Sequence, residues 1–286
     1  MKTIVRLTLM EAVRRRILWA FLGLTVVIAL LTAWGFSVLI DSAQRHGVND
    51  AQIEVGVSQI LILLAFMFSF VLAMSAAFLG APSISSEVES GVLLAVLARP
   101  LRRSELILGR WLGLAIIVVG YTAVAGLFEL GVTKLVTDYL PPQPVPAVAY
   151  LAGQAIVLLT ISVLLSTRLP GIAAGAICVV LFGLSWMAGV MGGIAAALNL
   201  PEVASLANGA RYLLPLDGLW KGTVFSLEPP SIALLGQLVG GRGGQAVSAN
   251  PFFATSGPAP AYLLYVALWV AAVLGLAIFS FRRREI

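Results

Sequence analysis

The sequence predicts an all-α membrane protein, built as a six-helix transmembrane bundle. Of its 286 residues, 60% are hydrophobic and 11% are charged, whereas a soluble domain carries roughly a quarter charged residues. Six apolar runs reach about 20 residues or more, the length that crosses a bilayer as a helix. Lys and Arg gather beside one end of these runs. A water-soluble fold is excluded, and a single transmembrane domain over residues 1–286 is expected.

The six predicted spans are separated by turn-forming residues such as Pro82 and Pro170. Glu129 is the one charged residue that falls inside them. The predicted spans are Ile17–Ile40, Val57–Ala81, Trp111–Thr133, Ala147–Thr167, Gly171–Leu198 and Ala261–Phe281.

The distribution of positive charge predicts the orientation. Thirteen of the 18 Lys and Arg residues lie on the side of the spans that holds both ends of the chain, and five lie on the other. Cytoplasmic loops retain Lys and Arg, so both termini are predicted to be cytoplasmic in a multi-pass protein of the cell membrane. The net charge is +5, and the Lys and Arg residues that produce it lie beside apolar runs. This position indicates contact with lipid headgroups and not with nucleic acid.

Residues 1–16 are predicted to form an amphipathic helix on the inner membrane surface. Val5, Leu9 and Val13 fall on one helical stripe. Glu11 stands four residues before Arg15, the favourable order for a helical ion pair.

The segment 199–260 is predicted to lie outside the cell. Its apolar pieces Tyr212–Phe225 and Ile232–Val239 are too short to cross a bilayer. They are therefore expected to be re-entrant or interfacial helices. Tyr212, Asp217, Trp220 and Lys221 combine aromatic and charged groups, which is typical of a belt at the membrane interface.

The cytoplasmic loop 82–110 is predicted to contain a short helix. Ser86 and Glu89 have capping-box spacing, so the helix is expected to start at Glu87. It should end near Arg99, because Pro100 disfavours helical geometry in the residue before it. Ser104 is expected to cap a second helix that begins at Glu105 and leads into the third span.

This loop resembles the intracellular loop of type 2 ABC transporter permeases. The resemblance rests on the acidic Ser85–Glu89 with Gly91, on Leu97–Pro100, and on Arg103 followed by Gly109 and Arg110. Two departures are Arg110, where that family often has lysine, and the pair Val92 and Leu93, where a threonine often follows the glycine. The amphipathic start, six spans and basic end extend the resemblance loosely over nearly the whole chain.

The resemblance implies that the helix Glu87–Leu97 is a coupling element, which sits in a cleft of a separate ATPase subunit. It also implies a second permease copy or a related permease as partner. ATP and Mg would be bound on the ATPase, and the chain has no phosphate-binding Gly-Lys-Ser or Gly-Lys-Thr loop. No catalytic residue and no cofactor are expected here. The implied coupling residues are Glu87, Glu89, Gly91, Leu93, Val96, Leu97, Arg99, Pro100 and Arg103.

Three further features have competing interpretations. Glu129 could belong to a substrate path or gate, or simply reach headgroups beside Lys134. The Gly171 and Gly189 GxxxG patterns predict close helix packing, within the chain or between two permeases. No metal site is predicted, because Cys178 and His46 are the only residues of their types.

The function predicted is that of an exporter permease whose substrate is unspecified, with a lipid or hydrophobic drug suited to the apolar composition. The alternative is a self-contained secondary transporter or channel, which predicts several ionisable residues or broken helices within the spans. An intramembrane enzyme ranks last, since the spans contain no paired catalytic side chains.

Overall fold

The computed structural model describes residues 1–14, 16–89, 102–232 and 250–283, with the backbone alone for 12–14, 16–18 and 86–89. Within these ranges all regular structure is α-helical, and six helices are long and apolar enough to cross a membrane. The predicted fold class is thereby confirmed. The helices are α1 (Lys2–Arg14), α2 (Arg16–Arg45), α3 (Asp50–Gly80), α4 (Pro82–Glu89), α6 (Arg103–Thr137), α7 (Pro144–Ser166), α8 (Gly171–Ala197), α9 (Pro201–Leu213), α10 (Asp217–Leu227) and α13 (Pro260–Arg282).

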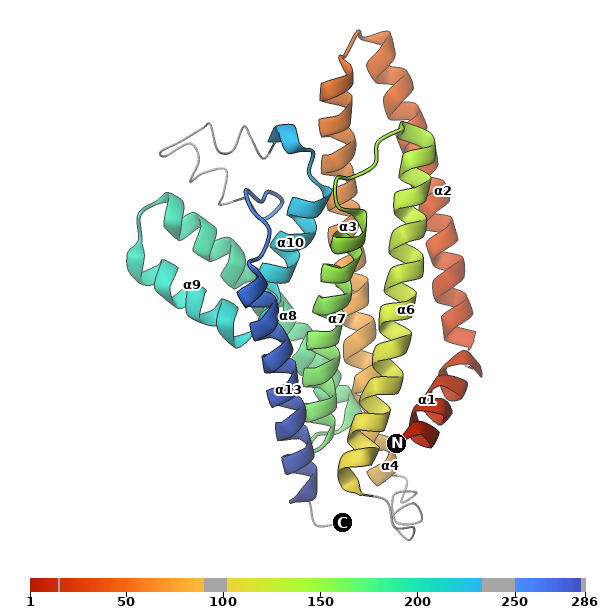
Figure 1. Cartoon of the computed structure of the whole chain (residues 1–286), viewed down its shortest axis with the longest axis vertical. Helices are drawn as coiled ribbons and strands as arrows, with labels where there is room; N and C mark the ends of the chain where they lie inside the picture. Colours follow the sequence, from red (N-terminus) through yellow and green to blue (C-terminus); the bar gives the residue numbers. More distant parts are fainter. Residues whose placement is uncertain (15, 90–101, 233–249, 284–286) are drawn as a thin grey trace.

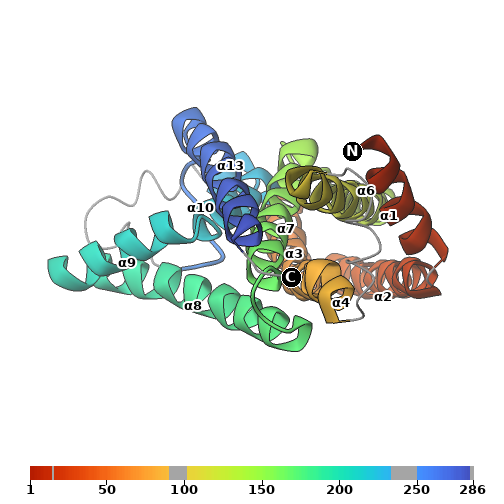
Figure 2. The same cartoon turned by 90° about the horizontal axis from the view of Figure 1, so that it is seen from below.

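The long helices form an elongated bundle with both chain ends at one end of it (Figure 1). Helices α1 and α4 lie at this same end, and the turn between α2 and α3 lies at the other. Helices α8 and α9 extend sideways from the bundle in both views (Figures 1 and 2). An even number of candidate spans returns the chain to the side where it started.

Helix α7 is the centre of the bundle, because α3, α6, α8, α10 and α13 all pack against it. Its sequence has no charged residue, and a helix that is hydrophobic all round is suited to burial on every side. Helix α2 is peripheral by contrast. Trp19, Leu30 and Trp34 on α2 are each at least 65% exposed, as expected for side chains that face lipid.

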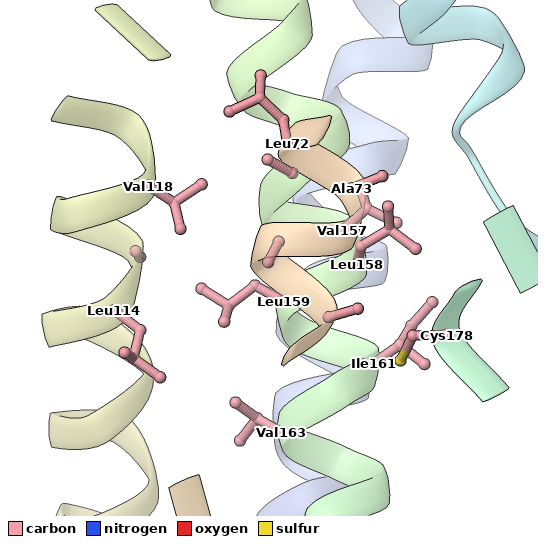
Figure 3. Close-up of a cluster of buried hydrophobic side chains, with 14 of the residues drawn as sticks. Leu72, Ala73, Leu114, Val118, Val157, Leu158, Leu159, Ile161, Val163 and Cys178 are labelled. Atoms are coloured by element: carbon pink, nitrogen blue, oxygen red, sulfur yellow. The ribbon is translucent and has the colours of Figure 1, made fainter. Parts of the chain in front are cut away.

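Among the described residues, the largest core cluster joins α7 to α3, α4, α6, α8, α10 and α13, and Figure 3 shows part of it. Leu72 of α3 and Leu114 of α6 lie on two sides of α7, and Cys178 of α8 lies near its Ile161. Small residues allow the helices to approach closely. A Cβ on Gly80 would lie 2.9 Å from Cβ of Ser162, and one on Gly126 would lie 2.9 Å from Cγ2 of Val148.

Helix α1 packs along the first part of α6. A Cβ on Gly109 would lie 2.9 Å from Cβ of Ile4, and one on Gly113 would lie 2.7 Å from Cβ of Thr8. Glu11 forms an ion pair with Arg110, with 3.1 Å between Oε2 and Nη1. The predicted partner of Glu11, Arg15, lies outside the described residues.

Helices α9 and α10 follow a sharp reversal after α8. Asn199 has a φ of 54°, a left-handed conformation that asparagine tolerates better than most residues. Pro201 then occupies the first turn of α9, where its missing N–H costs nothing. Helix α9 returns along α8, and α10 packs against α7. The described part of the segment 199–260 is therefore mostly helical, and nearly all of the piece Ile232–Val239 lies outside the described residues.

Candidate functional site

The predicted coupling loop is only partly described. The backbone of Glu87 and Glu89 lies in the last two turns of α4. Arg103 is the first residue of α6. Gly91, Leu93, Val96, Leu97, Arg99 and Pro100 lie outside the described residues.

Two predicted helix starts in this loop are wrong. Helix α4 begins at Pro82, five residues before Glu87, so Ser86 lies within the helix and does not cap it. Proline is favoured in the first helical turn, and this signal outweighs the capping-box spacing. Helix α6 begins at Arg103 after Arg102, so Ser104 is also inside a helix.

The first turns of α4 are anchored to the bundle. Ile84 is fully buried in the main core cluster. The hydroxyls of Ser83 and Ser166 are 3.4 Å apart, which links α4 to the end of α7. A Cβ on Gly171 would lie 3.3 Å from Oγ of Ser85, which brings the start of α8 against α4. A displacement of α4 would therefore act directly on α7 and α8.

Arg103 connects the end of the predicted coupling loop to the last helix. Its Nη1 donates hydrogen bonds of 3.1 Å to the carbonyl oxygens of Phe281 and Arg282, and its guanidinium lies over the Phe281 ring. Arg168 likewise donates to the Ser280 carbonyl at 3.0 Å. Cations are favourable at a helix C-terminus, where carbonyls lack helical partners. Arg103 thus ties the loop to α13.

A cavity of about 560 Å³ lies among α2, α3, α6 and α7. Its lining is mostly aliphatic and aromatic, with four polar side chains. Two of them, Thr25 and Tyr121, bond to each other, with 3.0 Å between their hydroxyl oxygens. The other two are Thr32 and Glu129. The volume falls within the range of pockets that bind small molecules, roughly 300–1,000 Å³.

Glu129 places a carboxylate at this cavity. Its Oε1 is buried and has no hydrogen-bond partner among the described residues, whereas Thr32 bonds to the carboxylate through its side chain. The nearest cation in the sequence, Lys134, is engaged elsewhere. Its Nζ lies 2.6 Å from Oδ1 of Asp138 and 2.7 Å from the Asp138 carbonyl oxygen. Glu129 is therefore directed at the cavity and is not paired with Lys134.

A partly buried ion pair joins α8, α9 and α10. Asp217 is 8% exposed, and its Oδ2 lies 2.8 Å from Nε of Arg211 in an ionic contact. The Arg211 Nη2 donates to the Gly189 carbonyl oxygen at 3.0 Å. A Cβ on Gly189 would lie 2.0 Å from Oδ1 of Asp217. The small-residue face of α8 is thus used within this chain, where Gly175 also packs against Phe78.

The side chains of Trp220, Lys221 and Glu228, here called the α10 clamp, hold residues 250–254. Trp220 Nε1 donates to the Pro251 carbonyl at 2.8 Å, and Lys221 Nζ donates to those of Asn250 and Phe253 at 2.8 Å. The Ala254 N–H donates to Glu228 Oε2 at 3.3 Å. Trp220 is 3% exposed. The interpretation of Asp217, Trp220 and Lys221 as an interfacial belt is therefore wrong, because these side chains hold the segment together.

Glu228 predicts a pH-dependent stability. Burial raises the pKa of its carboxyl from 4.5 to about 8, although the Ala254 N–H and Lys221 favour the charged form. The folded state then binds more protons than the unfolded state between these two values. Stability should fall by on the order of 4 kcal/mol as the pH rises from about 4.5 to about 8.

Thermal unfolding of wild type and Glu228→Gln across this pH range would check the expectation. The glutamine keeps an acceptor for Ala254 but does not titrate, so its unfolding temperature should depend less on pH. Glu202→Gln, an exposed carboxyl on α9, is the control that should behave as wild type. Equal pH dependence in wild type and Glu228→Gln would refute the assignment to Glu228.

Sequence reasoning missed several of these residues. Gln154 of α7 accepts a hydrogen bond from Ser69 and donates one to the Leu216 carbonyl. It could have been noticed in the sequence, since it is a polar side chain in an apolar span, and such residues bond across helices. Glu228 and Arg211 gave none, because nothing in a Gly- and Pro-rich loop shows which charges the fold buries. The cavity depends on the splay of α2 from α3, which no local pattern encodes.

Comparisons with known proteins identify the family to which this chain belongs. A search of curated proteins found no match. The family model described as ABC-2 family transporter protein matches residues 3–286, which is nearly the whole chain. Proteins of this family are membrane components of ABC transporters and are not themselves catalytic, in accord with the six apolar helices. The chain therefore belongs to the ABC-2 family of transporter proteins.

Proposed function

We propose that this chain is the permease subunit of an ABC exporter, forming a substrate path across the cytoplasmic membrane and driven by a separate ATPase subunit. Family membership is the observation that carries the proposal. The ATPase would bind ATP and Mg, and a second permease copy or a related permease would complete the path. Both termini and the coupling loop would lie in the cytoplasm.

The contacts around the loop support a mechanical route for coupling. Pressure on α4 would reach α7 and α8 through Ile84 and the close approach of Ser85 to Gly171. The end of the loop would move α13 through Arg103. One cytoplasmic displacement would thus act on three spans together. This tilting of spans would expose the substrate path outward.

Purification from native membranes in mild detergent tests the proposal. We expect an ATPase subunit to accompany the chain and to be lost on deletion of residues 87–97. The mass of the purified complex would distinguish one permease copy from two, and mass spectrometry would distinguish identical from related copies. A chain that purifies alone and transports in liposomes without ATP would refute the proposal.

Charge reversal in the loop should uncouple the two subunits. Glu87→Lys or Glu89→Lys would place a positive charge near the expected ATPase contact. We expect the permease-dependent part of the ATPase rate in proteoliposomes to fall about tenfold, a loss of about 1.4 kcal/mol in coupling. Glu202→Lys on α9 is the matched control and should leave the rate unchanged. Unaltered coupling in both loop variants would contradict the assignment of these residues.

A further inference from the structure

We infer that the cavity among α2, α3, α6 and α7 binds a hydrophobic cation, held by Glu129. The inference rests on the proposed function in one respect, that the ligand is taken to be a transport substrate. The binding itself is a property of this chain alone.

The walls favour an apolar body of drug size. The lining residues Leu24, Ile28, Leu64 and Val71 present aliphatic side chains to a volume of about 560 Å³. Apolar area removed from water stabilises a bound ligand by roughly 25 cal/mol per Å². A strongly polar or polyanionic ligand would lose its hydration against these walls without compensation.

The charge at the cavity selects a cation. Oε1 of Glu129 is buried without a hydrogen-bond partner, and no ion pair found among the described residues includes Glu129. A charged group in an apolar region is costly unless it is paired. A ligand cation would supply the missing partner and favour the charged form of the carboxyl group, and a ligand anion would not.

Aromatic side chains add to the preference for positive charge. Phe36, Phe68 and Tyr121 line the same cavity as Glu129. The faces of aromatic rings attract cations, most strongly where water is excluded. The hydroxyls of Thr25 and Tyr121 bond to each other, so the carboxylate is the principal polar anchor.

The cavity is open at the surface of the bundle. Leu24, Leu31 and Met67 line it and are also between 47% and 61% exposed. These residues come from α2 and α3, so the opening lies between the two helices. A hydrophobic cation dissolved in the membrane would be able to enter from the side.

Equilibrium binding of tetraphenylphosphonium to the purified full-length chain in nanodiscs tests the inference. Tetraphenylborate, which has nearly the same shape and the opposite charge, is the matched probe. We expect Glu129→Gln to weaken tetraphenylphosphonium binding about tenfold or more and not to weaken tetraphenylborate binding. Glu202→Gln should bind both ions as wild type does, which accounts for partition of the ions into lipid.

A second pair of variants locates the site. Gly35 lines the cavity, and a Cβ at this position would meet no atom within 4 Å, so Gly35→Leu should fill the cavity without a clash in the bundle. Tetraphenylphosphonium binding should then be lost. Gly23, on the same helix, also has open space at its Cβ position but does not line the cavity. Gly23→Leu should bind as wild type does.

Two results would overturn the inference. Unchanged tetraphenylphosphonium binding in Glu129→Gln would show that the carboxylate does not select the ligand and that the cavity accepts apolar chains such as those of lipids. Unchanged binding in Gly35→Leu would place the site elsewhere. Neither result would count against the proposed function, because that function is tested by association with the ATPase. Glu129→Gln should retain this association.

Discussion

Gly189→Ala is expected to destabilise the protein by about 3 kcal/mol, because the methyl group is added at the closest approach found for any described glycine. The new Cβ would lie 2.0 Å from Oδ1 and 2.7 Å from Cγ of Asp217. Asp217 is buried and paired with Arg211, which itself donates to the Gly189 carbonyl. A carboxylate displaced by the methyl group would lengthen its 2.8 Å contact with Arg211, so the packing of α10 against α8 should weaken.

The single cysteine allows the unfolding temperature of the bundle to be measured. Cys178 lies on α8 and is fully buried, so a dye that fluoresces on reaction with thiols reports unfolding of the bundle. The unfolding temperature of Gly189→Ala should fall clearly below that of wild type. Gly183→Ala is the matched control, because a Cβ at Gly183 on the same helix meets no atom within 4 Å. Equal unfolding temperatures for the two variants would rule out the described packing.

Gln154→Leu is expected to cost about 2–3 kcal/mol of stability. The Gln154 Oε1 accepts a hydrogen bond of 2.8 Å from Ser69, and its Nε2 donates one of 3.0 Å to the Leu216 carbonyl. Gln154 thereby joins α3 and α7 to the start of α10. Leucine is of similar size but would leave the buried Ser69 hydroxyl without its acceptor. The Leu216 carbonyl would keep only the Trp220 N–H, whose nitrogen lies 2.9 Å away.

A double-mutant cycle measures this network. Ser69→Ala alone should cost about 1 kcal/mol, because it removes one hydrogen bond. The double variant Ser69→Ala with Gln154→Leu should cost less than the sum of the two single changes, since the alanine leaves no hydroxyl unpaired. The thiol dye gives the three unfolding temperatures. Strict additivity would show that Ser69 and Gln154 do not interact in the membrane.

The sequence predicted the architecture well, for a physical reason. A span is recognisable by its length and by the absence of charge, and both are local properties. The six predicted runs all coincide with long helices, and only their ends differ. Val57 was the predicted start of the second span, whereas α3 starts at Asp50, because Asn49 caps it through a bond to the Gln52 N–H.

The polar interior could not be predicted in the same way. Asp217 falls in the piece Tyr212–Phe225, which was predicted as a re-entrant or interfacial helix, and Glu228 follows this piece. Neither position indicates burial, which comes from the packing of distant segments around α10. Glu129 was recognised as exceptional, but its direction depends on which face of α6 meets the cavity. Local patterns identified which residues were unusual, and the contacts between distant segments determined what they do.

The position of α10 has a consequence for the order in which the chain is built. Helix α10 packs on α7, α3 and α8, and all three precede it in the sequence. The surface against which α10 packs, which includes Gln154, is therefore synthesised before α10. Helix α13 comes last, and Tyr265 and Trp269 then donate to the carbonyls of Tyr212 and Leu213 at the end of α9. The last helix, α13, can therefore make its contacts with the end of α9 only after the helices that pack against α10 have been synthesised.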